Sequence, residues 1–82
     1  MTINFKTEIE QQMIQSIKRY FRDELEQEIG DLKARLLLNF IKLEIGPVIY
    51  NEAIRDAQGF FQDRVVDLEG ACFEPEFTYW KD

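Results

Sequence analysis

The side chains that could do chemistry in this 82-residue sequence are carboxylates, because it contains no histidine and a single cysteine. If residues 47–68 form a helix, four acids at helical spacing fall within a sector of about 60°: Glu52, Asp56, Asp63 and Asp67. Asp63 and Asp67, one turn apart, could share a hard cation. Asp56 and Asp63 are about 10 Å apart along the axis, however, so the four acids cannot surround one ion. We expect no metal, and interpret the stripe as a solvated face or a surface for a basic partner.

The carboxylates and the single cysteine are poor candidates for catalysis in this sequence. Without histidine the chain lacks the commonest general base and the nucleophile triads that depend on it. Paired carboxylates act as acid and base where burial separates them, whereas this pattern places them on exposed faces. Cys72 lies among acidic residues that disfavour a nucleophilic thiolate, so we interpret it as a packing residue. We therefore expect no catalytic residue, no cofactor and no enzyme activity; an enzyme would need Asp63 and Asp67 to line a concave pocket.

The composition narrows the class of protein further. Sixteen acidic against ten basic residues give a formal net charge of −6, which disfavours binding to nucleic acid. The chain is 45% hydrophobic, too apolar for a disordered tail, and no apolar run approaches the roughly 18 residues of a membrane span. One cysteine cannot form an intramolecular disulfide, and the first residues do not resemble a signal peptide. We expect a single globular domain in the cytoplasm.

The N-terminal half indicates an extended arm followed by a helix. Residues 1–6 include the alternation of polar and apolar side chains that is typical of a short extended segment. Thr7 and Glu10 fit a capping box, which predicts a helix beginning at Glu8. Five carboxylates without a base between residues 23 and 31 predict that this helix frays or bends and stops at Gly30.

The sequence predicts two more helices after residue 30. Asp31 caps a helix over residues 32–45, which is apolar around most of its circumference and must be covered on several sides. Gly46 ends this helix in the left-handed conformation, and Pro47 begins a third helix that runs to Leu68. The apolar stripe of that third helix also contains an arginine, which needs a partner or an exit to solvent.

That arginine, Arg64, has two interpretations. Its stem lies on apolar surface with the guanidinium at the edge, or it pairs with a carboxylate of another helix or subunit. Residues 70–82 then change character, with four aromatic residues in eight positions that are costly to leave in water: Phe73, Phe77, Tyr79 and Trp80. We expect this aromatic tail to pack along the helices or to reach a second copy.

The predicted architecture is all-α: an extended arm (1–6), a three-helix antiparallel bundle (7–69) and an ordered aromatic tail (70–82) in one domain. We expect a homodimer. A chain this short buries only about 60% of its unfolded surface, and the second predicted helix has more apolar circumference than two neighbours cover.

Short blocks along the chain also resemble a family of small bacterial proteins, the domain of unknown function 2164. The resemblance extends from Phe5 to Trp80 and rests on an ordered set of blocks: Glu28-Ile29-Gly30-Asp31-Leu32-Lys33, Glu44-Ile45-Gly46-Pro47, Ile49-Tyr50-Asn51, Asp56-Ala57, Asp67-Leu68-Glu69-Gly70 and Glu74-Pro75-Glu76-Phe77. It implies a bacterial cytosolic protein, and it brings no activity, substrate or catalytic residue.

Two functions remain open. The first is a non-enzymatic interaction or regulatory module that engages another protein through the four acids of the stripe and the four aromatic residues of the tail. The second is a dimeric DNA-binding regulator of the ribbon–helix–helix type, in which Thr2, Asn4 and Lys6 of paired arms enter the major groove. The second function requires a continuous basic patch, formed by Lys6 and three residues of the first helix: Lys18, Arg19 and Arg22.

Overall fold

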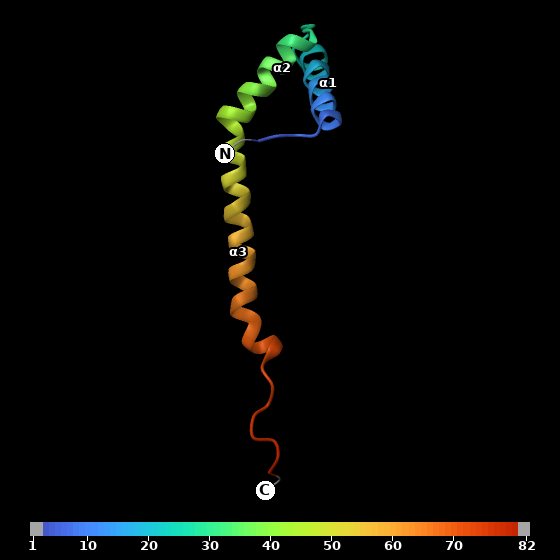
Figure 1. The fold of residues 1–82 in the computed structure, drawn as a ribbon. Coiled ribbons are helices and arrows are strands. Elements are labelled where there is room, and N and C mark those ends of the chain that lie inside the picture. Colours follow the sequence, from blue (N-terminus) through green and yellow to red (C-terminus); the bar gives the residue numbers. More distant parts are fainter. Residues whose placement is uncertain (1–2, 81–82) are drawn as a thin grey trace. The chain divides into compact units, whose positions relative to one another are not determined.

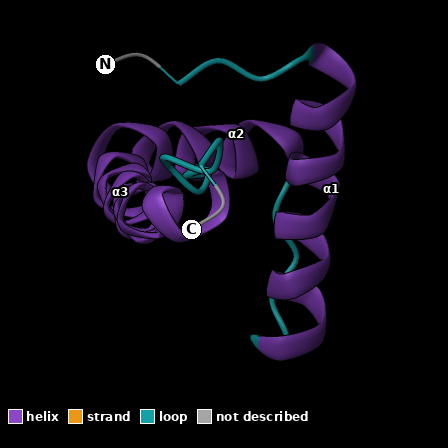
Figure 2. Cartoon of the chain, turned by 90° about the horizontal axis from the view of Figure 1, so that it is seen from below, coloured by secondary structure: helices purple, strands orange, loops and turns teal. Residues whose placement is uncertain are grey.

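The computed structural model describes residues 3–80, which form helices and loops without a strand (Figures 1 and 2). The elements are α1 (Thr7–Glu24), α2 (Asp31–Phe40), the π-helical turn η1 (Ile41–Ile45) and α3 (Gly46–Cys72). The predicted all-α class is confirmed. Four positions of the predicted arm and tail lie outside the described residues: Met1, Thr2, Lys81 and Asp82.

Helix α1 starts and ends differently from the prediction. Lys6 is the N-cap and no side chain caps the helix, so the capping box of Thr7 and Glu10 is wrong. The backbone N–H of Glu10 donates to the Lys6 carbonyl at 2.9 Å. At the other end α1 stops at Glu24, before the predicted stop at Gly30, and Glu26 adopts a left-handed φ of 52°. Carboxylates at a helix C-terminus oppose its dipole, which favours this early end.

The predicted turn at Gly46 is also wrong. Gly46 has right-handed helical angles (φ −52°, ψ −45°), and its N–H donates to the Ile41 carbonyl five residues earlier. Pro47 has no N–H to donate, so the helical ladder must miss one bond here, and a π turn next to the proline accommodates that gap. A Cβ on Gly46 would lie 2.5 Å from Cδ1 of Ile3. An added Cβ would require only the end of the flexible Ile3 side chain to shift, so Gly46 leaves room for the arm and does not serve a left-handed turn.

The helix does not reverse at Gly46, so the predicted three-helix antiparallel bundle is not confirmed. The contacts divide the chain into two units, Met1–Asn51 and Glu52–Asp82. In the first unit, α1 packs against α2 around a small core of Ile14, Ala34 and Leu38, which are at most 5% exposed. Gly30, not Asp31, is the N-cap of α2.

The second unit contains the greater part of α3 and the tail. Helix α3 passes the predicted end at Leu68 and the glycine at position 70, and it stops at Cys72. The backbone N–H of Phe73 still donates to the Glu69 carbonyl, at 3.1 Å. Between residues 52 and 80 every residue except Gly59 is exposed. This unit, taken by itself, therefore has no core of its own.

Candidate functional site

The acidic stripe lies on α3, and all four of its carboxylates belong to exposed residues. One acid of the stripe is paired, because Arg55 forms an ion pair with Glu52. The other three acids take part in none of the ion pairs within the described residues: Asp56, Asp63 and Asp67. These three charges are available to a partner.

The acids of the stripe do not meet around a shared centre. In the part of the chain that the structure describes, no group of three or more Asp, Glu or Cys side chains could hold a metal ion. A shallow concavity of about 770 Å³ on α3 is lined by apolar and amide side chains, among them Ile54 and Val65. At 100° per residue, Asp63 and Asp67 lie on the other side of the helix from these residues. The concave pocket that acid–base chemistry would need is therefore not formed by these two acids.

The aromatic tail exposes all four of its aromatic side chains. Phe73 is 72% exposed, Phe77 90%, Tyr79 82% and Trp80 74%. Tyr79 and Trp80 form an edge-to-face pair with ring centroids 4.8 Å apart. Phe77 has a left-handed φ of 56°, which is uncommon for a bulky residue. The structure thus pairs two of the four aromatic residues.

Arg64 lies over an aromatic ring of its own helix. Its guanidinium carbon lies 5.1 Å from the centroid of the Phe60 ring, one helical turn earlier on α3. Phe60 in turn packs edge-to-face on Phe61, with centroids 5.8 Å apart. The guanidinium thus rests on an aromatic surface, and no carboxylate among the described residues pairs with it.

Three of the four bases that a DNA-binding surface requires are held by acids. Lys18 donates to Asp31 at 2.8 Å, and Arg19 and Arg22 both donate to Asp23 at 3.2 Å. The Arg22 hydrogen bond, and then that of Arg19, lowers the pKa of Asp23 below its ordinary value of 3.8. The Lys18 hydrogen bond likewise lowers the pKa of Asp31. The basic surface is therefore interrupted by carboxylates.

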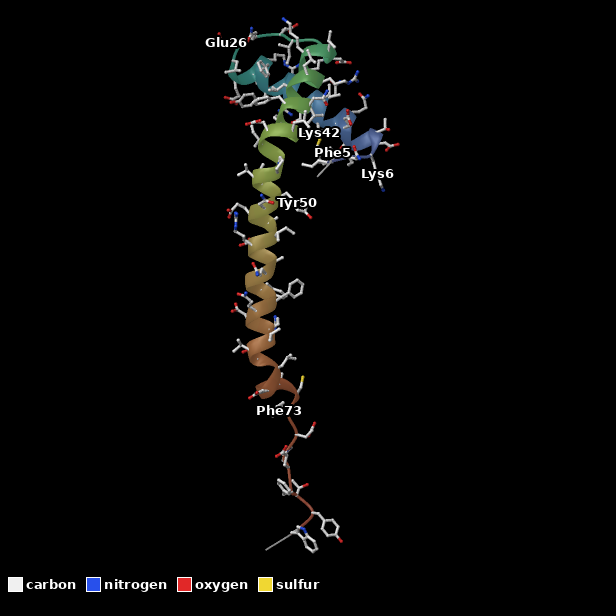
Figure 3. The ribbon with its side chains drawn as sticks, turned by 60° about the vertical axis from the view of Figure 1, so that its left-hand side comes forward. Phe5, Lys6, Glu26, Lys42, Tyr50 and Phe73 are labelled. Carbon is white, nitrogen blue, oxygen red and sulfur yellow. The ribbon has the colours of Figure 1, made fainter. Side chains whose placement is uncertain are left out.

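Lys42 has a role that the sequence did not reveal. Its side chain is only 16% exposed and donates to Glu10 of α1 at 3.3 Å. Its ammonium also lies 5.3 Å from the centroid of the Phe5 ring (Figure 3). Lys42 thus connects the arm, α1 and η1. The spacing of 32 residues between Glu10 and Lys42 gives no local sequence signal for this contact.

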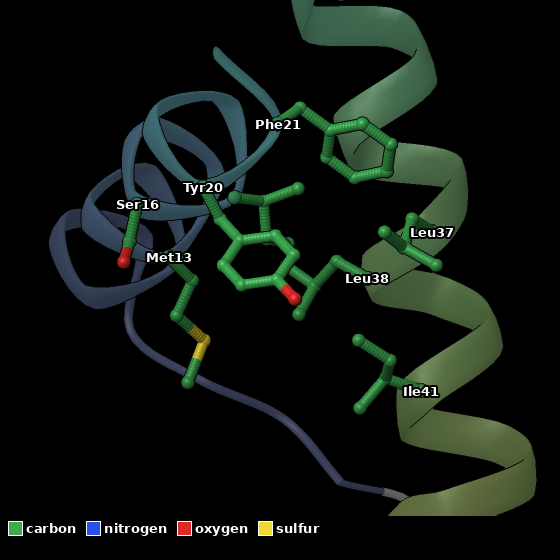
Figure 4. A pocket seen from close by; sticks show the side chains of 8 residues that line it. Met13, Ser16, Tyr20, Phe21, Leu37, Leu38 and Ile41 are labelled. Carbon is green, nitrogen blue, oxygen red and sulfur yellow. The ribbon is translucent and has the colours of Figure 1, made fainter. Parts of the chain in front are cut away.

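An apolar groove between α1 and α2 was also missed (Figure 4). It encloses about 510 Å³ and is lined by side chains from both helices and η1: Met13, Ser16, Ile17, Tyr20, Phe21, Leu37, Leu38 and Ile41. The groove remains because α2 covers only part of the apolar side of α1, and no local pattern of residues reveals this.

None of the helices in the described residues is long and apolar enough to cross a membrane. The family described as uncharacterized conserved protein (DUF2164) matches residues 3–76. Neither a curated protein nor a solved structure matches the chain. Since the family match spans most of the sequence, the chain belongs to the DUF2164 family of uncharacterized conserved proteins.

Proposed function

We propose that this protein is a non-enzymatic interaction module of the bacterial cytosol, which binds another protein through the acidic stripe and the aromatic tail of residues 52–80. The observation that carries the proposal is the exposure of this segment. The large aromatic side chains of its tail are all exposed, from 72% for Phe73 to 90% for Phe77. Contiguous exposed apolar surface of this kind marks interaction sites in soluble proteins.

The exposed side chains of this segment indicate what kind of protein would bind it. Aromatic side chains carry much of the energy of protein interfaces when they enter pockets. The tail offers four of them, and α3 adds three unpaired carboxylates on one side of the helix. The partner we propose is a protein with a basic surface beside an apolar cleft, in which the basic surface accelerates the encounter and the cleft holds the complex.

The DNA-binding alternative is less well supported. A ribbon–helix–helix dimer pairs two strands, and residues 3–80 contain none. The surface that would face phosphate carries carboxylates, because the three bases are ion-paired with acids: Lys18 with Asp31, and Arg19 and Arg22 with Asp23. A net charge of −6 adds to the repulsion.

The test is affinity capture from the native cytosol, followed by calorimetry with the recovered partner. The test variant is Phe77→Ala with Trp80→Ala. The matched control is Leu32→Ala with Leu43→Ala, two side chains in the first unit that are 70% and 79% exposed. We expect the tail variant to weaken the affinity for the partner by at least about 100-fold, and the control by less than about threefold.

A second pair of variants tests the charges. Asp63→Asn with Asp67→Asn is expected to slow association and to reduce its dependence on salt, with little change in dissociation. A partner that is bound equally by the tail variant, or the recovery of nucleic acid alone, would contradict the proposed function.

A further inference from the structure

The apolar side of α3 carries a seven-residue repeat that the proposed function does not use. From Ile54 to Ala71 the positions on one stripe alternate in spacing between three and four residues. Such spacing is typical of helices that pack against another helix along their length. One set of positions holds large side chains, and the other holds alanine or arginine: Ile54, Phe61 and Leu68 in the first, Ala57, Arg64 and Ala71 in the second.

The amount of surface on this stripe matches what a stable helix pair buries. Five large apolar side chains on or beside the stripe are between 50% and 64% exposed: Ile54, Phe60, Phe61, Val65 and Leu68. Each of these side chains exposes roughly 80–100 Å², so together they offer about 400–500 Å² of apolar surface to a partner. A stable interface buries about 800 Å² per partner, of which somewhat more than half is apolar. One partner helix of the same length would cover the stripe.

We propose that the occupant is α3 of a second copy, paired antiparallel. The order of large and small side chains makes the stripe complementary to itself in this orientation. When Ala57 faces the partner's Phe61, the twofold axis crosses the pair at the level of residue 59, and Phe61 faces the partner's Ala57. Each bulky ring is then received by a small residue. In a parallel pair Phe61 would face its own copy, and the two Ala57 residues would leave a gap between the helices.

Arg64 favours the same orientation. In a parallel pair the two copies of Arg64 would face each other in the core of the interface, where like charges are destabilising. In the antiparallel pair Arg64 faces the partner's Ile54, and the two guanidinium groups lie far apart. The guanidinium already rests on the Phe60 ring, so its stem can pack on apolar surface while its charge stays over an aromatic face.

This inference is independent of the proposed function, because it concerns a different side of α3 and a different partner. Its first test uses Phe61→Glu and, as a matched control, Val66→Glu. Val66 is 78% exposed and lies nearly opposite the stripe on the same helix. Sedimentation equilibrium of the full chain is expected to show a dimer that Phe61→Glu weakens by at least about 100-fold and that Val66→Glu leaves within about threefold. A monomeric wild type, or equal effects of the two variants, would overturn the inference.

The second test needs no substitution, so it does not depend on whether a variant folds. Cys72 is the single cysteine, is exposed and ends α3, so a spin label on it reports the orientation directly. In the antiparallel register Cys72 lies level with the partner's Gly46, which separates the two labels by about 39 Å at 1.5 Å per residue. A pulsed electron paramagnetic resonance distance near that value supports the pairing. A distance under about 20 Å would indicate parallel helices and overturn it.

Discussion

Replacing Ile14 with alanine tests the packing of the first unit most sharply. Ile14 is fully buried, at 0% exposure, in a core that contains only two other buried residues. The substitution removes three carbon groups worth about 0.8 kcal/mol each, or about 2.4 kcal/mol, and the cavity adds to that cost. The groove between α1 and α2 is open beside this core, so neighbouring side chains can partly relax. We expect a loss of about 3 kcal/mol in the free energy of unfolding.

The matched control is Ile9→Ala on the same helix, where the side chain is 42% exposed. It is expected to cost about 1 kcal/mol, because the alanine removes less buried surface and leaves no enclosed cavity. The assay is urea unfolding followed by far-ultraviolet circular dichroism, with hydrogen exchange to show that the loss is located in α1 and α2. If Ile14→Ala cost no more than Ile9→Ala, the core as described here would be refuted.

Three further predictions follow from particular contacts. A double-mutant cycle on Glu10 and Lys42, whose side chains are 28% and 16% exposed, is expected to give a coupling of about 1 kcal/mol by urea unfolding; additive effects would exclude the ion pair. The folded pKa of Asp31 is lowered by Lys18, so its stabilising effect is present above 3.8 and is lost as the pH falls through the folded pKa. Asp31→Asn is therefore expected to flatten the acid limb of the stability profile below about pH 4, and high salt to reduce the difference. Gly59→Ala adds a Cβ with nothing within 4 Å, so it is expected to raise the thermal midpoint through about 1 kcal/mol of helix propensity; a lower midpoint would contradict the open space beside Gly59.

The all-α class was predictable because each helix carries a strong apolar period in its own residues. The ends of the helices were predictable only where neighbouring residues in the sequence determine them. Gly46 and Pro47 have the composition of a helix end followed by a new helix, yet the approach of Ile3 and the π turn explain both residues inside a continuous helix. That explanation depends on a contact between residues far apart in the sequence, which spacing along the chain cannot reveal.

The candidate site was predictable to a similar extent. The acidic stripe and the aromatic tail are local patterns, and the structure leaves both exposed. The contacts of Lys42 with Glu10 and Phe5, and the groove beside Tyr20, arise from packing between elements. The run of carboxylates indicated that α1 would fray or bend before residue 30. It did not indicate the left-handed backbone of Glu26, because glycine at position 30 is the residue that more often ends a helix in this conformation.

We propose that α3 is an association surface and not a helix covered by water. Amide hydrogen exchange of the full chain, measured across residues 54–71 at low and high protein concentration, tests it most directly. We expect slow exchange in this segment that becomes slower as the protein concentration rises, while exchange in α1 stays unchanged. Fast exchange over residues 54–71 at every concentration would contradict it.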